Sequence, residues 1–202
     1  DSMELGYAIQ SYENINHDGV VIIGEQPDYE VQAEFIQPLP NDWSSKSPYH
    51  DVLNKYLTAC EHIEGDFIIS NDDFFTLPNA RIKNYNRGTL TDHIKSRYED
   101  FYTKGLKNTR EALKRKGYGE LSFELHVPMI VNSKKLKEAI EEIIPLIENG
   151  NVIMIRSYYG NKFKVKSEYM EDIKNKDPVN GFMSSNESTF KRKYGYKIRS
   201  LI

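Results

Sequence analysis

The chain has 202 residues, of which 39% are apolar and 28% are charged, and its formal net charge is −3. This length suits one α/β domain with a hydrophobic core and is short for two domains. The small negative charge argues against a protein that attracts nucleic acid over its whole surface. We therefore expect a single domain over residues 1–202, with a basic C-terminal segment over residues 186–202.

Cysteine content and hydropathy indicate the cellular setting. The single cysteine, Cys60, excludes an internal disulfide and a Cys-rich zinc site, and a reducing compartment fits this composition. Apolar runs all fall well short of the roughly 20 residues that cross a bilayer, and no signal peptide is recognisable. We expect a cytoplasmic protein without a membrane span.

The first third of the chain alternates between helical and extended patterns. Asp1 and Glu4 have the spacing of a helix capping box, and apolar residues at helical intervals follow, so a helix is expected over residues 1–12. Short apolar runs predict strands over 20–23 and 33–36. A second helix is expected over 51–63, with Cys60 on its apolar face.

The remaining elements continue this alternation. The sequence predicts a strand over 67–69, a charged helical stretch over about 92–116, an extended segment over 122–125, a helix over 133–147 and a strand over 152–155. The helical stretch is expected to face inward with Ile94, Tyr98, Phe101 and Leu106. Such an alternation is typical of an α/β fold with a sheet flanked by helices.

The most informative residues follow the 67–69 strand. Asn71, Asp72 and Asp73 form an acidic tip where ligands of open α/β sheets bind, beyond the carboxyl end of a strand. Neighbouring carboxylates need a compensating charge, and oxygen ligands favour Mg²⁺ or Mn²⁺. We expect Asp73 to hold the metal and Asp72 to lie nearer a bound sugar or the loop backbone. An ordinary polar turn is the alternative, because all three residues favour turns.

The tip also carries a family resemblance. Residues 67–75, ending in Asn-Asp-Asp-Phe-Phe, resemble a signature of the Stealth proteins and of related phage and bacterial glycosyltransferase-like proteins. Residues 4–11, 126–131 and 152–161 are similar to three further motifs of that family, in the same order. Gly6 and Gln10 depart from the pattern, since they stand where the family has arginines.

The resemblance implies a fold, an activity and a site. It implies a glycosyltransferase-A-like domain with a mixed, mostly parallel sheet, a nucleotide-sugar donor, and a divalent cation, Mn²⁺ or Mg²⁺. Asp72 and His126 match the catalytic positions, and Asp73 matches the metal position. Donor contacts are implied for Asn71, Asp72, Arg156 and Asn161.

His126 and Arg156 allow more than one interpretation from the residues themselves. His126 could be a buried structural residue, a general base or a nucleophile that attacks phosphorus. Arg156 ends a predicted strand and could contact phosphate or pair with an internal aspartate. His17, His50, His62 and His93 are expected to be surface or structural residues.

Two basic stretches, 104–116 and 190–199, are expected to be solvated surface or to contact a phosphate-rich acceptor. Three functions therefore stay open. The first is a metal-dependent glycosyltransferase with an unknown acceptor, such as a polysaccharide, a teichoic-type polymer or modified DNA. The second is a Stealth-type sugar-phosphate transferase that releases a nucleoside monophosphate. The third is a non-catalytic module that binds polymer or nucleic acid.

Overall fold

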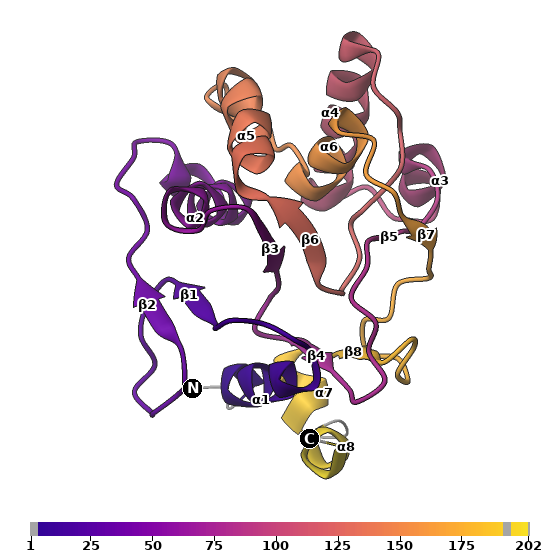
Figure 1. Ribbon diagram of the computed structural model, residues 1–202. Helices are drawn as coiled ribbons and strands as arrows, with labels where there is room; N and C mark the ends of the chain where they lie inside the picture. Colours follow the sequence, from indigo (N-terminus) through magenta and orange to yellow (C-terminus); the bar gives the residue numbers. More distant parts are fainter. Residues whose placement is uncertain (1–3, 192–194, 202) are drawn as a thin grey trace.

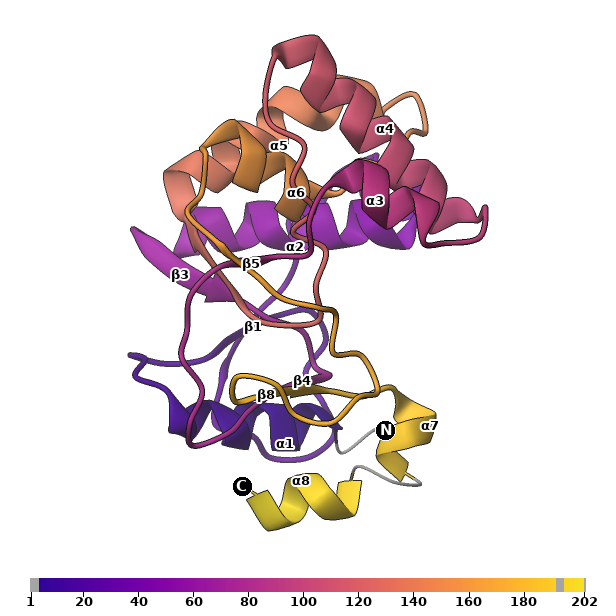
Figure 2. The ribbon, with the colours of Figure 1, turned by 90° about the vertical axis from the view of Figure 1, so that its right-hand side faces the viewer.

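The computed structural model describes residues 4–191 and 195–201. Five helices of the described chain lie together at one end of the molecule: α2 (Pro48–His62), α3 (Leu90–Lys95), α4 (Phe101–Lys116), α5 (Ser133–Ile147) and α6 (Ile155–Lys162). Helices α1 (Glu4–Ser11), α7 (Glu187–Thr189) and α8 (Gly195–Leu201) lie at the other end (Figure 1, Figure 2). Short 3₁₀ turns at Tyr12–Asn14 and Ser44–Lys46 complete the helical elements. The expected capping box at Asp1 lies outside the described residues.

The strands pair two by two. Strand β1 (Val21–Ile23) pairs in parallel with β2 (Glu34–Ile36), and β3 (Asp66–Ile69) pairs antiparallel with β6 (Met129–Asn132). Strand β4 (Phe74–Thr76) pairs antiparallel with β8 (Phe182–Ser184), and β5 (Tyr85–Asn86) pairs in parallel with β7 (Glu168–Tyr169). The prediction of an α/β protein is confirmed, but the described residues form these four small sheets in place of one mostly parallel sheet.

A side chain takes the place of a further strand beside β6. Asn84 donates from its amide nitrogen to the Ile130 carbonyl over 3.1 Å and accepts from the Ile130 amide over 2.8 Å. The backbone groups that would otherwise recruit a neighbouring strand are thus already satisfied. This contact limits the sheet at β6 to two strands.

Most predicted helices and strands are present. Helix α5 has the predicted bounds, because Asn132 caps its first turn and its apolar stripe packs into the main core. Leu136, Ala139, Ile140, Ile143 and Ile147 on this stripe are all buried. Helix α2 begins three residues before the predicted start, because Ser47 caps it and Pro48 occupies its first turn. Cys60 packs at the edge of the same core.

The stretch predicted over residues 92–116 is helical over most of its length, but it is not one continuous helix. The chain forms α3 and α4 instead, because Thr89 and Asp100 each accept a hydrogen bond from a backbone amide and start separate helices. The connection between them turns Tyr98 and Phe101 outward, where they are 94% and 52% exposed. Ile94 and Leu106 face the core as expected.

The strand predicted over residues 152–155 is also wrong, and the extended segment predicted over 122–125 forms no strand. Residues 152–154 are buried but irregular, and Ile155 begins α6. Ser122, Phe123 and Leu125 are likewise buried in an irregular segment. Side chains supply the hydrogen bonds that a strand would make: the Phe123 amide donates to Ser157 Oγ, and the Met154 amide donates to Thr109 Oγ1. Apolar runs of this kind indicate burial but do not distinguish a strand from an irregular buried segment.

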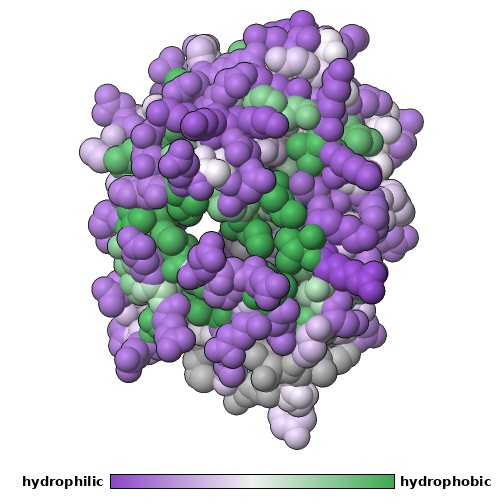
Figure 3. Space-filling model, in the orientation of Figure 1, coloured by the Kyte–Doolittle hydropathy of each residue, from purple (hydrophilic) through white to green (hydrophobic). Residues whose placement is uncertain are grey.

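A mainly apolar hollow opens between the two ends of the molecule. It measures about 410 Å³ and is lined by Ile15, Asn16, Asp66, Phe67, Ile68, Ile82 and Ile130. The space-filling view shows apolar residues gathered in the middle of this face (Figure 3). Among the described residues, no helix has both the length and the apolar character needed to span a bilayer.

Candidate functional site

The acidic tip is the turn that joins β3 to β4. Phe74 and Phe75, which follow it, are 2% and 0% exposed, so the turn is tied to the core as the sequence indicated. Tyr12 also holds it, because its hydroxyl donates to Ser70 Oγ over 2.8 Å and to the Asn71 carbonyl over 3.2 Å. The buried Phe74 and Phe75 and the Tyr12 hydroxyl thus hold the Asn-Asp-Asp turn in position.

The two aspartates of the tip differ in their surroundings. Asp73 forms an ion pair through Oδ2 with Lys174, and its Oδ1 is buried with no hydrogen-bond partner among the described residues. Asp72 lies on the exposed part of the turn. Partial desolvation, with the neighbouring charge of Asp73, raises the pKa of Asp72 above its ordinary value.

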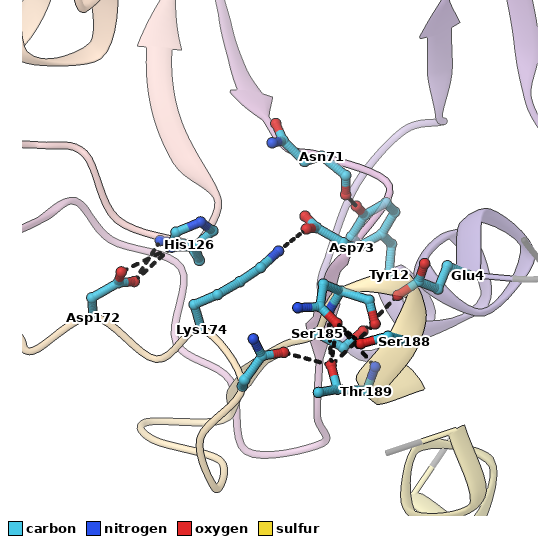
Figure 4. A network of polar contacts seen from close by, with 12 residues as sticks. Glu4, Tyr12, Asn71, Asp73, His126, Asp172, Lys174, Ser185, Ser188 and Thr189 are labelled. Atoms are coloured by element: carbon cyan, nitrogen blue, oxygen red, sulfur yellow. Dashed lines mark hydrogen bonds and ion pairs between the residues drawn. The ribbon is translucent and has the colours of Figure 1, made fainter. Parts of the chain in front are cut away.

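His126 lies opposite this turn and is paired with Asp172. Its Nδ1 lies 2.8 Å from Asp172 Oδ1 and 3.0 Å from Oδ2, and its backbone amide donates to the same Oδ1 over 3.2 Å. Figure 4 shows Lys174 extending between this pair and Asp73. One short segment, residues 172–174, thus contacts both the histidine and the acidic tip.

Asp172 is ionised in this arrangement. Burial alone would raise its pKa, but the hydrogen bonds and charge of His126, together with Arg87, outweigh burial and lower the pKa to about 2. Arg87 Nη1 lies 3.6 Å from Asp172 Oδ2. Because an ionised carboxylate can only accept, His126 must carry its proton on Nδ1 toward Asp172. Its Nε2 is then available to the pocket.

Arg156 holds the loop on either side of His126. Its Nη1 donates to the Leu125 carbonyl over 2.7 Å, and its Nη2 donates to the Val127 carbonyl over 2.5 Å. The guanidinium also lies 6.0 Å from the ring centroid of Phe74. Carbonyls satisfy donors without cancelling charge, and within the described chain Arg156 has no carboxylate partner. A net positive charge therefore remains beside the histidine.

These residues line one pocket of about 450 Å³. Its polar lining comprises Asn71, Arg87, Arg97, Glu124, His126, Arg156 and Asp172, and its aromatic lining comprises Tyr49, Tyr56, Phe74 and Tyr102. Helices α2 and α4, the segments before β6 and α6, and the β3–β4 turn all contribute. A concave site with mixed apolar and convergent polar groups is typical of small-molecule binding.

The pocket unites some of the residues predicted from the sequence. Asn71, His126 and Arg156 line it together, whereas Asp72 and Asp73 lie on the adjoining turn and are not part of its lining. Asn161 is 5% exposed and uses its amide on the Leu121 backbone and on the Ser157 carbonyl. Asn161 thus has a structural role in α6 that the sequence did not indicate.

Sequence reasoning missed Asp172, Lys174, Arg87 and Glu124. Asp172 and Lys174 lie in an irregular stretch whose composition resembles an ordinary polar loop, and they reach partners 46 and 101 residues away. A local pattern carries no signal for pairs at this separation. The one available hint was that a part-buried histidine or aspartate, such as His126 or Asp73, needs a charged or hydrogen-bonding partner.

The described residues do not fit a resident divalent cation at Asp73. Lys174 already balances the Asp73 carboxylate, and no group of three His, Cys, Asp or Glu side chains is placed to hold a metal ion in the part of the chain that the structure describes. A cation at this position would have to displace the ammonium group. The expected Mn²⁺ or Mg²⁺ therefore stays a prediction.

The other histidines have the surface or structural positions expected of them. His50 is 1% exposed and its Nε2 lies 2.9 Å from the Asn151 carbonyl, and His93 is 2% exposed and bonded to Ser122. His17 and His62 are exposed. The basic face of α4 is partly neutralised, since Lys107 pairs with Glu99 and Lys116 pairs with Glu142.

Fold and site together define a mixed α/β protein with a histidine–aspartate pair in a pocket of net positive character. A comparison with protein-family models finds no match. A comparison with curated protein sequences also finds no match.

Proposed function

We propose that the protein is a glycosyltransferase that uses a nucleotide-sugar donor. The observation that carries this proposal is the guanidinium of Arg156, which lacks a carboxylate partner among the described residues and lies beside the His126–Asp172 pair in one pocket. A guanidinium whose charge has no counter-ion favours an anionic ligand beside it. A histidine with a free Nε2 provides a base at the same place.

The chemistry assigns a separate task to each residue. Nε2 of His126 takes the proton from an acceptor hydroxyl while Asp172 stabilises the imidazolium that forms. The acceptor oxygen forms a bond to the anomeric carbon, and the bond from that carbon to the diphosphate oxygen breaks. Arg156 and Arg87 stabilise the charge of the leaving nucleoside diphosphate. We assign no step to a metal ion, because Lys174 already balances Asp73.

A second candidate, sugar-phosphate transfer, is supported by the position of Arg156. Because this arginine binds the carbonyls of both neighbours of His126, a phosphate on the guanidinium would lie close to the imidazole. The acceptor oxygen would then attack phosphorus, and a nucleoside monophosphate would leave. The two reactions differ in the nucleotide released.

The proposed fold is a glycosyltransferase-A-like domain, and the position of Asn71 supports it. Asn71 follows the carboxyl end of β3 and lines the pocket. The acceptor is proposed to be a hydroxylated polymer or modified DNA. For the alternative of a non-catalytic binding module, exposed lysines and arginines on α4 would supply the surface.

The test combines donor binding with product analysis. Thermal shifts are measured with UDP-, GDP- and TDP-sugars, with EDTA and with Mn²⁺, for the natural sequence, His126→Asn and the control His17→Asn on the exposed surface. We expect one donor class to stabilise all three proteins, while slow hydrolysis of that donor is lost only in His126→Asn. Release of nucleoside diphosphate supports glycosyl transfer, and release of monophosphate supports sugar-phosphate transfer.

Two results would contradict the proposal. The first is that no nucleotide sugar raises the melting temperature of the natural protein. The second is that His126→Asn hydrolyses the bound donor as fast as the natural protein does, since the imidazole would then have no role in the chemistry.

A further inference from the structure

The pocket has an aromatic side with a single carboxylate. Tyr49 and Tyr56 reach it from α2 and Tyr102 reaches it from α4, and Glu124 lines it two residues before His126. Burial raises the pKa of all three tyrosine hydroxyls, and the charge of Glu124 adds to the rise in each case. The carboxylate is therefore close enough to act electrostatically on the whole aromatic side.

The two oxygens of Glu124 have different surroundings. Oε1 accepts from the Ser157 amide over 3.0 Å and from the Ser157 hydroxyl over 2.8 Å, so it caps the first turn of α6. Oε2 has no hydrogen-bond partner among the residues that the structure describes, and Glu124 is only part-buried. Helix capping thus accounts for the role of Oε1 and leaves Oε2 as a hydrogen-bond acceptor on the pocket wall.

Glu124 is also unlike the rest of the lining. Arg87, Arg97 and Arg156 make the remaining polar wall cationic, and Asp172 is already engaged by His126 and Arg87. Arg97 stacks over Tyr102 with its guanidinium carbon 4.7 Å from the ring centroid. A free carboxylate oxygen would repel the phosphates that the arginines favour, so it is suited to a different, neutral part of a ligand.

We infer that Glu124 and the three tyrosines form a subsite for a neutral, hydroxylated sugar ring, with Glu124 Oε2 accepting hydrogen bonds from its hydroxyl groups. Aromatic faces contact the apolar C–H groups of such a ring, and a carboxylate gives strong, directional acceptance of O–H donors. Glu124 is then a specificity-determining residue. This inference rests on the proposed function, because it names the substrate group that the pocket holds beside the diphosphate.

The experiment uses Glu124→Gln, because the Gln carbonyl oxygen can keep the cap on Ser157 while the second acceptor is lost. Glu120→Gln, at an exposed position, is the matched control. Calorimetry measures the affinities of the best nucleotide sugar, of the corresponding nucleoside diphosphate, and of glucose, galactose and N-acetylglucosamine with that diphosphate present. The first comparison tests a donor sugar, and the monosaccharides test an acceptor sugar.

We expect Glu124→Gln to weaken one sugar-containing ligand by about tenfold and to leave the nucleoside diphosphate affinity within about twofold of that of the natural protein. Loss in the nucleotide-sugar arm assigns the subsite to the donor, and loss in the monosaccharide arm assigns it to the acceptor. Unchanged affinities in both arms, with an unchanged melting temperature, would overturn the inference and leave Glu124 as a helix cap. If the natural protein binds no nucleotide at all, the proposed function fails, while the three monosaccharides measured without a nucleotide still test Glu124.

Discussion

Asp172 binds His126 at three points: its Oδ1 lies 2.8 Å from the imidazole Nδ1 and 3.2 Å from the backbone amide, and its Oδ2 lies 3.0 Å from Nδ1. The carboxylate therefore fixes the ring, the tautomer and the local backbone together. An imidazole held in this way presents Nε2 in one orientation, which is what a proton-transfer residue requires.

Asp172→Asn removes the charge of this pair while preserving its size. Because the amide no longer stabilises an imidazolium, we expect the transfer rate to fall by about 100-fold, with donor affinity nearly unchanged. Turnover and calorimetry on the same preparations check this. A variant that loses donor affinity and keeps its rate would mean that Asp172 acts in binding.

Asp172 also makes the free energy of unfolding depend on pH. Its pKa is lowered to about 2 from an ordinary 3.8, so its contribution to stability is complete above about pH 4 and is lost as the pH falls toward 2. The side chain is 21% exposed, and the contribution is about 2 kcal/mol. Urea unfolding at pH 6 and pH 2 should show the difference between the natural protein and Asp172→Asn shrinking by this amount.

His93 titrates in a higher window. Burial, with Arg87 and Arg97 nearby, lowers its pKa to about 4, and its side chain is 2% exposed. Protonation therefore favours the unfolded chain, and about 3 kcal/mol of stability present above pH 6.5 is lost by pH 4. We expect His93→Gln to flatten this part of the stability curve. An identical stability curve in the variant would show that the pKa of His93 is the same in the folded and unfolded chains, which would contradict this prediction.

Arg156→Lys keeps the positive charge but cannot serve two carbonyls with a planar fork. We expect a loss of about 1–3 kcal/mol of unfolding free energy, because one buried carbonyl beside His126 would lack its donor. Arg115→Lys, at an exposed position of α4, is the control and should change stability little. Equal stability of the two variants would argue against a structural role of the guanidinium.

Lys174→Met leaves the Asp73 carboxylate without its counter-ion. Lys174 and Asp73 are 26% and 20% exposed, so we expect a loss of about 1–3 kcal/mol, with partial recovery in the double variant with Asp73→Asn. Lys176→Met is the control, because Lys176 forms a longer, exposed pair with Glu171. Urea unfolding of the natural protein, Lys174→Met, Asp73→Asn and the double variant provides the double-mutant cycle.

The same proteins test the predicted cation. If Lys174 is the resident positive charge, Mn²⁺ should not raise the melting temperature of the natural protein. A rise that is absent in Asp73→Asn would instead show that the cation displaces Lys174, as the sequence prediction requires.

The sequence by itself determined the elements that depend on neighbouring residues. Helix α5 was predicted with its observed bounds, because its cap, its apolar stripe and its end signal all lie within about 20 residues. The acidic turn after β3 and the buried Phe74 and Phe75 were likewise readable, since a strand, a polar tip and two aromatics follow one another directly.

Only the tertiary structure decided which apolar segments became strands and which side chains met. In the irregular 152–154 segment Thr109 Oγ1 accepts a hydrogen bond from the Met154 amide, and the histidine pair forms because a distant loop brings Asp172 to His126. Contacts of this kind depend on the path of the whole chain, and no local periodicity encodes them. Asn71, His126 and Arg156 were thus predictable from the sequence, whereas Asp172, which pairs with His126, was visible only in the tertiary structure.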